Sequence, residues 1–206
     1  MRVLILGAGG HAKVVADTIE TSGHVVVGFL DDDPGLWGKQ RLGLPVLGSI
    51  AEYADFAADG TIVAIGSNQT RKEICGKLEP PAHPRWVNAL HPHAILARSA
   101  RLGVGDAILT AAVVNADTEI GDHVIINTGA TVDHDCRLSS FAHIGPGAHL
   151  AGGVVVGRGV LIGIGASVAP GCVIGDWAII GAGATVIHDI PDRVVATGTP
   201  ARWKEV

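Results

Sequence analysis

A strict six-residue repeat dominates the sequence from residue 90 onward. Every sixth residue from Leu90 to Val186 is Leu, Ile or Val, giving seventeen positions in one unbroken register. A second column, four residues after each of these, holds mostly small apolar residues. An α-helix returns to the same face every 3.6 residues and cannot use this period, whereas a coil of short strands joined by turns can. The repeat therefore predicts a parallel β-helix.

Three hexads make one triangular coil of eighteen residues, so residues 90–191 supply between five and six coils. One large and one small inward residue per hexad suit a narrow interior, and the glycines that follow many of the large residues suit tight corners. The composition agrees, with 29 glycines, 48% hydrophobic residues and only 4% aromatic residues. Cys136 and Cys172 share a column two coils apart, about 9.6 Å at the strand spacing, so we expect core thiols and no disulfide between them.

The first half of the chain follows another pattern. Apolar runs at 3–6, 25–30 and 61–65 alternate with amphipathic stretches at 12–21 and 71–78. Continuous apolar strands separated by helices predict a parallel sheet covered on both faces, with ligands at the carboxyl ends of its strands. We therefore divide the chain into a Rossmann-like βαβ domain at 1–89 and a β-helix domain with a short C-terminal tail at 90–206.

Composition and charge exclude several classes of protein. No apolar run approaches the ~18 residues of a membrane-spanning helix, and the N-terminus does not resemble a signal peptide, so we expect a cytoplasmic protein with no membrane association. The net charge is −5 without a Lys/Arg cluster, which argues against nucleic acid as a partner. His91 and His93 lack a third ligand at suitable spacing, so we expect no metal.

Short motifs throughout the chain carry a family resemblance. They include the hexads that begin at Ile120, Ile144 and Ile174, and the segments Gly7-Ala8-Gly9-Gly10-His11, Asp31-Asp32, Ile65-Gly66-Ser67-Asn68 with Arg71-Lys72, Asp133-His134-Asp135-Cys136 and Gly198-Thr199-Pro200-Ala201. Over nearly its whole length the chain resembles the NeuD and PglD type of hexapeptide-repeat sugar acetyltransferase. The resemblance implies a left-handed β-helix and a homotrimer. It also implies that acetyl-CoA acetylates the amino group of a nucleotide-linked 4-amino-4,6-dideoxy sugar.

Acetyl transfer to an amine needs a base whose pKa lies near neutrality and a donor for the developing oxyanion. His134 lies between Asp133 and Asp135 and matches the catalytic histidine of the family, with Asp135 as its acidic partner where relatives often carry Glu. Residues eighteen apart stack on neighbouring coils, so Gly152 is expected beside His134. This small neighbour leaves space for a thioester, and the N–H of Gly152 or Gly153 is a candidate oxyanion donor.

His143 follows His134 by half a coil and is therefore expected on the opposite side of the β-helix. If both histidines serve one reaction centre, they come from adjacent subunits, which favours a trimer with sites at its interfaces. Alternatively, His143 only packs in the trimer. The resemblance implies that His143, Ile164 and Ala182 contact acetyl-CoA and that Asn127 borders the site.

A glycine turn between the first strand and the first helix is typical of a nucleotide site, because backbone N–H groups approach a pyrophosphate there. The resemblance assigns nucleotide-sugar binding to six residues, Gly9, Gly10, His11, Asp31, Asp32 and Gly66. The nucleotide remains open between UDP, GDP and dTDP.

Two alternative functions remain. The first is O-acetylation of a sialic acid or similar sugar hydroxyl. The second is a non-catalytic trimeric scaffold that binds NAD, since the turn is close to the Gly-x-Gly-x-x-Ala dinucleotide fingerprint. Three further histidines, His83, His123 and His149, are assigned to the surface or to packing.

Overall fold

The N-terminal part is a five-stranded sheet flanked by helices. The computed structural model describes residues 1–78 and 84–205. The sheet has the order β3-β4-β2-β1-β5, with β3 antiparallel to β4 and the other pairs parallel. Its strands are β1 (Arg2–Leu6), β2 (Val25–Leu30), β3 (Gln40–Arg41), β4 (Leu44–Gly48) and β5 (Gly60–Val63), and its helices are α1 (Gly10–Thr21), α2 (Asn68–Leu78) and the short 3-10 helices η1 (Pro34–Leu36) and η2 (Ile50–Asp55).

Both faces of this sheet are covered. Ile5 belongs to a buried cluster with Val15 of α1, whereas the next residue, Leu6, belongs to a second cluster with Ile74 of α2. Successive strand residues point to opposite faces, so an unbroken apolar strand needs cover on each side. The sequence-based prediction of a doubly covered parallel sheet is confirmed.

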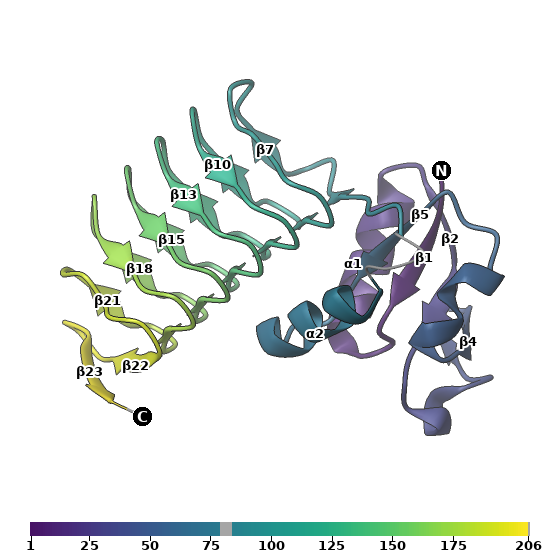
Figure 1. The fold of residues 1–206 in the computed structure, drawn as a ribbon. Coiled ribbons are helices and arrows are strands. Elements are labelled where there is room, and N and C mark those ends of the chain that lie inside the picture. Colours follow the sequence, from purple (N-terminus) through teal and green to yellow (C-terminus); the bar gives the residue numbers. More distant parts are fainter. Residues whose placement is uncertain (79–83, 206) are drawn as a thin grey trace.

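The second part is a solenoid whose coils stack away from the first part, with the C-terminus at the far end (Figure 1). Three sheets form its sides, in the orders β23-β22-β20-β17-β14-β11-β8-β6, β21-β18-β15-β12-β9-β7 and β10-β13-β16-β19. All their strand pairs are parallel except β22 with β23. Most strands are two residues long: β6 (Ala89–Leu90), β7 (Ile95–Leu96), β8 (Ala107–Ile108), β9 (Val113–Val114), β10 (Glu119–Ile120), β11 (Ile125–Ile126), β12 (Thr131–Val132), β13 (Arg137–Leu138), β14 (His143–Ile144), β15 (His149–Leu150), β16 (Val155–Val156), β17 (Leu161–Ile162), β18 (Ser167–Val168), β19 (Val173–Ile174), β20 (Ile179–Ile180) and β21 (Thr185–Val186). Two longer strands, β22 (Val194–Thr197) and β23 (Arg202–Glu205), form a terminal hairpin.

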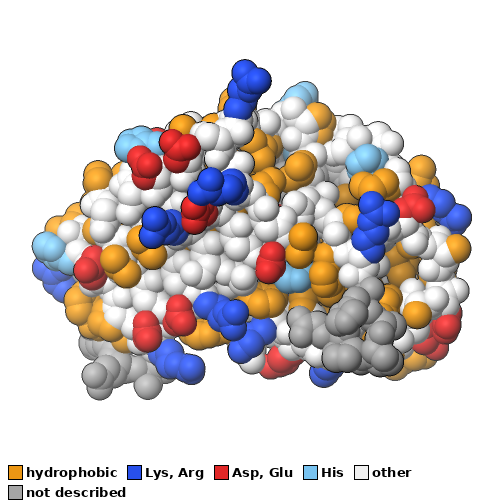
Figure 2. Space-filling model, turned by 45° about the horizontal axis from the view of Figure 1, so that its top comes forward, with side chains coloured by type: hydrophobic (Ala, Val, Ile, Leu, Met, Phe, Trp, Pro, Cys, Tyr) orange, Lys and Arg blue, Asp and Glu red, His pale blue; other side chains and the backbone are white. Residues whose placement is uncertain are grey.

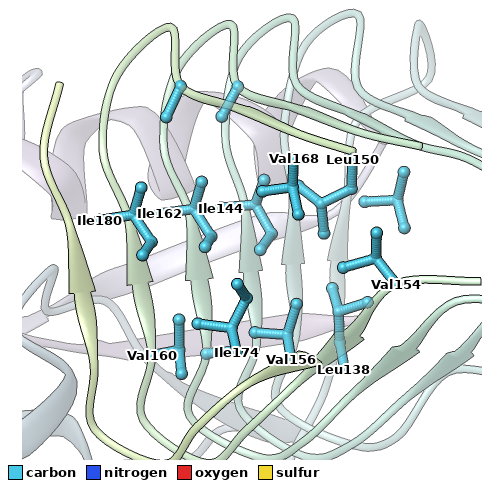
Figure 3. Packing of buried hydrophobic residues seen from close by; sticks show 14 of the residues in the cluster. Leu138, Ile144, Leu150, Val154, Val156, Val160, Ile162, Val168, Ile174 and Ile180 are labelled. Atoms are coloured by element: carbon cyan, nitrogen blue, oxygen red, sulfur yellow. The ribbon is translucent and has the colours of Figure 1, made fainter. Parts of the chain in front are cut away.

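The hexad column fills the interior of the solenoid. From Ile108 to Val186 each of its residues is at most 5% exposed. Figure 3 shows Ile144, Ile162 and Ile180 in one row, each on a successive coil. Paired strands are offset by eighteen residues, as in Ile126 with Ile144. The predicted β-helix is confirmed, and its handedness stays a prediction from the family.

The first hexads are less buried than their sequence suggests. Leu90 is in register, yet it is 37% exposed, and Leu96 and Leu102 are only half-buried. In a solenoid each coil is covered by the coils before and after it, and the first coil lacks a preceding one. The period identifies the inward position, but burial requires neighbours on both sides.

The glycines after the large inward residues are needed for close approach between coils. A Cβ on Gly145 would lie 2.6 Å from the carbonyl oxygen of Ile162, and one on Gly163 would lie 2.6 Å from that of Ile180. The left-handed backbone at the corners falls two residues later, for example at Gly147 with φ 60°. Asp135 adopts the same conformation with φ 58°, which short polar side chains tolerate better than most.

Asp106 interrupts the small apolar column and is completely buried. Its Oδ1 accepts a 2.8 Å hydrogen bond from the Val124 N–H, and its own N–H donates to Asn88 Oδ1. Its Oδ2 has no hydrogen-bond partner. Burial raises the pKa of Asp106 to about 8. The folded protein therefore holds this carboxyl in its neutral form at pH 7.

An asparagine at position 106 is expected to stabilise the protein at alkaline pH. The pKa of Asp106 is raised on folding, so its stabilising contribution is complete below pH 4 and is lost as pH rises through about 8. The Asp106→Asn variant keeps an acceptor for Val124 and never ionises. We expect a free energy of unfolding about 1–3 kcal/mol above that of the parent at pH 8, and little difference at pH 5. Calorimetry at both pH values tests this, and an unchanged pH dependence in the variant would contradict it.

Candidate active site

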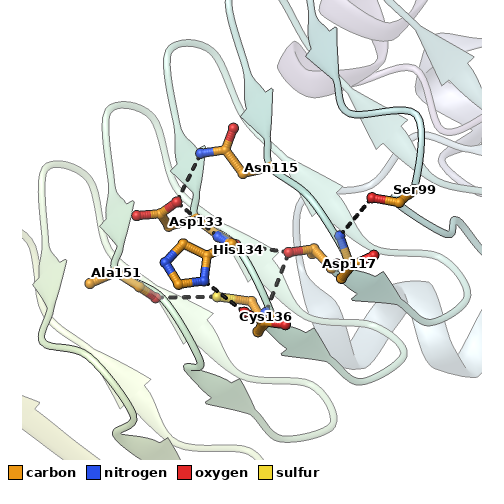
Figure 4. A network of polar contacts seen from close by, with 9 residues as sticks. Ser99, Asn115, Asp117, Asp133, His134, Cys136 and Ala151 are labelled. Carbon is orange, nitrogen blue, oxygen red and sulfur yellow. Dashed lines mark hydrogen bonds and ion pairs between the residues drawn. The ribbon is translucent and has the colours of Figure 1, made fainter.

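His134 lies at the corner between β12 and β13, where the six-stranded sheet turns into the four-stranded sheet. Its Nδ1 is 2.7 Å from Asp135 Oδ2, and its side chain is 61% exposed. Figure 4 shows the imidazole among polar groups of neighbouring coils. Because Nδ1 is bonded to the carboxylate, the proton sits there and Nε2 keeps its lone pair, as a general base requires.

Two carboxylates tune this histidine. The hydrogen bond that His134 Nδ1 donates to Asp135, followed by the charge of Asp133, raises the pKa of His134 above its ordinary value. Asp133 Oδ1 in turn accepts from the His134 N–H at 2.8 Å and from Asn115 Nδ2 at 2.9 Å. Both hydrogen bonds lower the pKa of Asp133, and the one from the His134 N–H has the larger effect. Asp133 and Asn115 thus fix the backbone of His134, while Asp135 fixes its ring.

The neighbouring coil meets the imidazole through Gly152. A Cβ on Gly152 would lie 2.6 Å from His134 Cε1 and 2.7 Å from Nε2, so only glycine leaves the ring its present place. The Gly153 N–H donates to the His134 carbonyl oxygen at 2.9 Å. The prediction of Gly153 as an oxyanion donor is therefore wrong, because its N–H already belongs to the hydrogen-bond ladder between coils. Gly152 stays a prediction for that role.

His143 lies on a different side, in β14 of the eight-stranded sheet that faces the N-terminal domain. Its Nδ1 is 3.3 Å from the Gly66 carbonyl oxygen, and Asn127 Nδ2 is 3.0 Å from its Nε2. The His11 ring centroid is 6.2 Å away. Burial, followed by the charge of Arg71, lowers the pKa of His143 to about 4. This imidazole is neutral, with Nδ1 as donor to Gly66 and Nε2 as acceptor.

The other predicted acetyl-CoA residues share the edge beside His143. Asn127, Ile164 and Ala182 all lie at corners between the eight-stranded and six-stranded sheets. Ile164 is 59% exposed, and its carbonyl accepts from the Gly183 N–H of the next coil. Within one chain this edge and the His134 corner lie on either side of the six-stranded sheet. The fold thus groups the predicted residues into two separate sets.

The predicted nucleotide-sugar residues gather at the carboxyl ends of β1, β2 and β5. Gly9 is the N-cap of α1, Gly10 is its first residue, and space is open beside both. Asp31 Oδ2 accepts from the Ala8 N–H at 2.7 Å and so shapes the glycine turn, and Asp32 Oδ1 accepts from Ser49 Oγ and the Ile50 N–H. The two acids hold the loops of this edge in place.

Several histidines have structural surroundings. His123 is buried between Trp86, at 4.8 Å edge-on, and Phe141, stacked at 5.3 Å. His149 is exposed and lies 2.9 Å from Thr131 Oγ1. Packing and surface positions are thus confirmed for these two, and His83 lies outside the described residues. The sequence indicates no role for Arg71 or Asn68, although both are buried between the domains.

Residues 1–78 and 84–205 contain neither a metal-ligand cluster nor a membrane-spanning helix. No group of three His, Cys, Asp or Glu side chains in that part of the chain is arranged to hold a metal ion. Within the same residues, no helix has the length and apolar character to cross a membrane. On the face drawn in Figure 2, acidic and basic side chains are interspersed.

A β-helix of hexad coils with a histidine and carboxylate pair at one corner defines the class of hexapeptide-repeat transferases. Family models agree with this class. Residues 2–78 match the PglD N-terminal domain, and residues 153–188 match the bacterial transferase hexapeptide with six repeats.

Solved structures extend the match to the whole chain. A histidine-to-asparagine mutant of perosamine N-acetyltransferase from Caulobacter crescentus, in complex with CoA and GDP-perosamine, is 43% identical, with a TM-score of 0.92 over 99% of this chain and 97% of that one. The acetyltransferase domain of PglB from Neisseria gonorrhoeae, in complex with acetyl coenzyme A, is 35% identical, with a TM-score of 0.91 over 98% of each chain. The chain belongs to the PglD-type hexapeptide acetyltransferases.

One curated relative matches only part of this chain. An uncharacterized protein of Acanthamoeba polyphaga mimivirus is 32% identical over 124 residues. The match covers 60% of this chain and only 24% of that protein, so the chain spans about a quarter of its length.

Proposed function

We propose that this protein transfers the acetyl group of acetyl-CoA to the amino group of a nucleotide-linked amino sugar, with His134 as general base. The observation that carries the proposal is the His134 Nδ1 contact with Asp135 at 2.7 Å, which leaves Nε2 free beside Gly152. A base oriented by a carboxylate and opening onto a glycine surface suits proton removal from an amine that attacks a thioester.

The reaction then runs in two stages. The amine nitrogen bonds to the thioester carbonyl carbon while its proton passes to His134 Nε2, and the carbonyl oxygen becomes an oxyanion. The carbon–sulfur bond then breaks, the carbonyl re-forms, and the protonated His134 returns a proton to the leaving thiolate. Asp135 holds the imidazole and stabilises its charged form between the stages. The Gly152 N–H is the candidate donor to the oxyanion.

We place GDP-linked perosamine, or a close 4-amino-4,6-dideoxy relative, first among the acceptors. The support is the 43% full-length identity to an N-acetyltransferase whose structure holds CoA and GDP-perosamine. That similarity also favours an amine acceptor over a sugar hydroxyl, and an enzyme over an NAD-binding scaffold. The cytoplasm is the expected compartment, because acetyl-CoA and nucleotide sugars are made there.

An acceptor panel tests this function. Thiol release from acetyl-CoA is measured with GDP-, UDP- and dTDP-linked 4-amino sugars, with each 4-hydroxy analogue as the matched control. We expect turnover with the amino sugars only, and the highest kcat/KM with a GDP-linked one. Acetylation of free sugar hydroxyls alone, or NAD binding without any acetyl transfer, would overturn the proposal.

The proposal includes a homotrimer whose subunits share each site. In one chain the His134 corner and the edge with His143, Asn127, Ile164 and Ala182 are separated by the six-stranded sheet. One acetyl-CoA molecule contacts both sets of residues when the His134 corner of one subunit lies against the His143 edge of the next. A cyclic trimer provides three such interfaces.

Mixed trimers of two inactive variants are expected to regain activity. When His134→Ala and His143→Ala chains are unfolded and refolded together in equal amounts, about one interface in four pairs two intact histidines. The measurement is kcat per chain, with each variant refolded alone as the control. Mixed trimers that are no more active than either variant alone would refute a shared site.

A further inference from the structure

Arg71 is 1% exposed and is the largest fully buried side chain in the described part of the chain. It lies on α2, and its guanidinium donates hydrogen bonds to both domains. Within the N-terminal domain, Nη1 donates to the Ile65 carbonyl and Nη2 to Asn68 Oδ1, both at 2.9 Å. On the β-helix, Nε donates to the His123 carbonyl at 2.9 Å and Nη2 to the Phe141 carbonyl at 2.8 Å. A single side chain thus ties the loop after β5 to two coils of the β-helix.

This buried cation has no ion-pair partner among the described residues. The ion pairs among residues 1–78 and 84–205 are Arg101 with Glu119 and His134 with Asp135, and both are at the surface. Burial lowers the pKa of Arg71 to about 10, so it remains charged at neutral pH. A buried charge costs free energy unless it is fully hydrogen-bonded. Here carbonyl oxygens surround it, which fixes its position strongly.

The same guanidinium flanks the contact between the two predicted substrate sites. His143 Nδ1 donates to the Gly66 carbonyl, and Gly66 is a predicted nucleotide-sugar residue. Arg71 Nη1 also lies 3.5 Å from that carbonyl, and Nη2 lies 3.4 Å from the carbonyl of Ala142, the residue before His143. Both sides of the Gly66–His143 contact are therefore held by Arg71.

We propose that Arg71 is a positioning residue for acetyl transfer: it fixes the Gly66 loop against the His143 strand and so sets the distance between the bound nucleotide sugar and acetyl-CoA. The inference rests on the proposed function. A guanidinium is suited to this task because its planar fork satisfies several carbonyls at once, which an ammonium cannot do.

The charge of Arg71 adds a second effect on His143. Burial comes first and Arg71 second among the causes that lower the pKa of His143 to about 4. The facing His11 is also neutral, with its pKa lowered to about 4 by burial, by His143 and by Arg71. A protonated His143 would need both nitrogens to donate, and it would lose the hydrogen bond from Asn127 Nδ2. Arg71 thereby favours the neutral form of His143, which the hydrogen bond from Asn127 Nδ2 to Nε2 requires.

Kinetics of two variants test the positioning role. Arg71→Lys keeps the positive charge but loses the planar guanidinium, and Arg71→Met loses both. The matched control is Lys77→Met, at an exposed site of the same helix. We expect kcat to fall about tenfold in Arg71→Lys and about 10²-fold in Arg71→Met, as for small misplacements of reactants. The KM for each substrate should change less than about threefold, because each site is intact, and the control should match the parent.

A merely structural role predicts something else. If Arg71 only stabilises the fold, its variants contain less folded protein, and calorimetry then gives a lower stoichiometry of acetyl-CoA binding. The kcat per acetyl-CoA binding site stays at the parental value. That result, or an unchanged kcat in folded Arg71→Lys and Arg71→Met proteins, would overturn the proposal.

NMR of the His143 ring gives a readout that does not depend on turnover. In the parent we expect a neutral ring with its proton on Nδ1 throughout pH 5–8, and in Arg71→Met a ring that titrates at a higher pH than in the parent. A parental ring that titrates near its ordinary value would overturn the inference even if neither variant folds. If the parent acetylates no member of the acceptor panel, the proposed function fails, and the ring measurement still decides whether Arg71 controls His143.

Discussion

Replacing His134 with alanine is expected to lower kcat by about 10²- to 10⁴-fold, the usual contribution of a positioned general base. Nε2 of this residue is the group placed to take the proton of the attacking amine, since Nδ1 is bonded to Asp135. The KM for acetyl-CoA should change much less, because the thioester does not need the base in order to bind. Steady-state thiol release with the preferred nucleotide amino sugar measures both constants.

The matched control is His188→Ala. His188 is exposed and occupies the same corner position three coils away, so its loss should leave kcat at the parental level. The parent should also lose activity as pH falls through a pKa above the ordinary value of histidine, because hydrogen bonding to Asp135 and the charge of Asp133 raise the pKa of His134 and only its neutral form accepts a proton. Near-parental kcat in His134→Ala, or the same acidic limb in the pH profiles of His134→Ala and the parent, would remove this residue from the mechanism.

A single methyl group at position 152 is expected to lower kcat about 10²-fold. The Cβ of Gly152→Ala would lie 2.7 Å from His134 Nε2 and 2.6 Å from Cε1, much closer than van der Waals contact allows. The imidazole must therefore tilt away from the position where it meets the amine, and a displacement of about 1 Å costs about this factor. The ring is exposed, so it has room to move and the fold should persist. Steady-state kinetics and thermal unfolding are the measurements.

Gly76→Ala serves as the control for Gly152→Ala. Gly76 lies within α2, and its Cβ would meet no atom within 4 Å. This variant should keep parental kcat and gain about 0.5–1 kcal/mol in the free energy of unfolding, because alanine favours the helix. If Gly152→Ala keeps parental kcat, then the space beside His134 is not where the reaction occurs. If it loses activity only in proportion to lost folded protein, then the glycine serves the coil alone.

Much of the fold was predictable because its cause is repeated. The seventeen-fold column of Leu, Ile and Val identifies the inward position of every coil, and Ile108 to Val186 are buried accordingly. Leu90 shows the limit, since it has the right residue type at the right spacing and is still 37% exposed. The pattern indicates which way a side chain points, but it does not show whether another coil covers it.

The candidate site was predictable in part for a similar reason. Stacking at eighteen residues placed Gly152 beside His134, and the structure has that neighbour at the imidazole. The same arithmetic did not show which N–H groups the ladder uses, and Gly153 proved to be bonded to the His134 carbonyl. The roles of the site residues stay predictions, whereas their grouping at two edges is a structural result.

The sequence by itself determined the β-helix, the doubly covered sheet and the position of His134 beside two acids, because each depends on a local or strictly periodic pattern. Only the tertiary structure decided how the two halves of the chain meet. Arg71 bonds the carbonyls of His123 and Phe141, which lie 52 and 70 residues away, and His143 reaches Gly66 across 77 residues. These acceptors are backbone oxygens, which every residue type carries. The partners of Arg71 on the β-helix therefore leave no mark in the sequence and exist only once α2 lies against the coils.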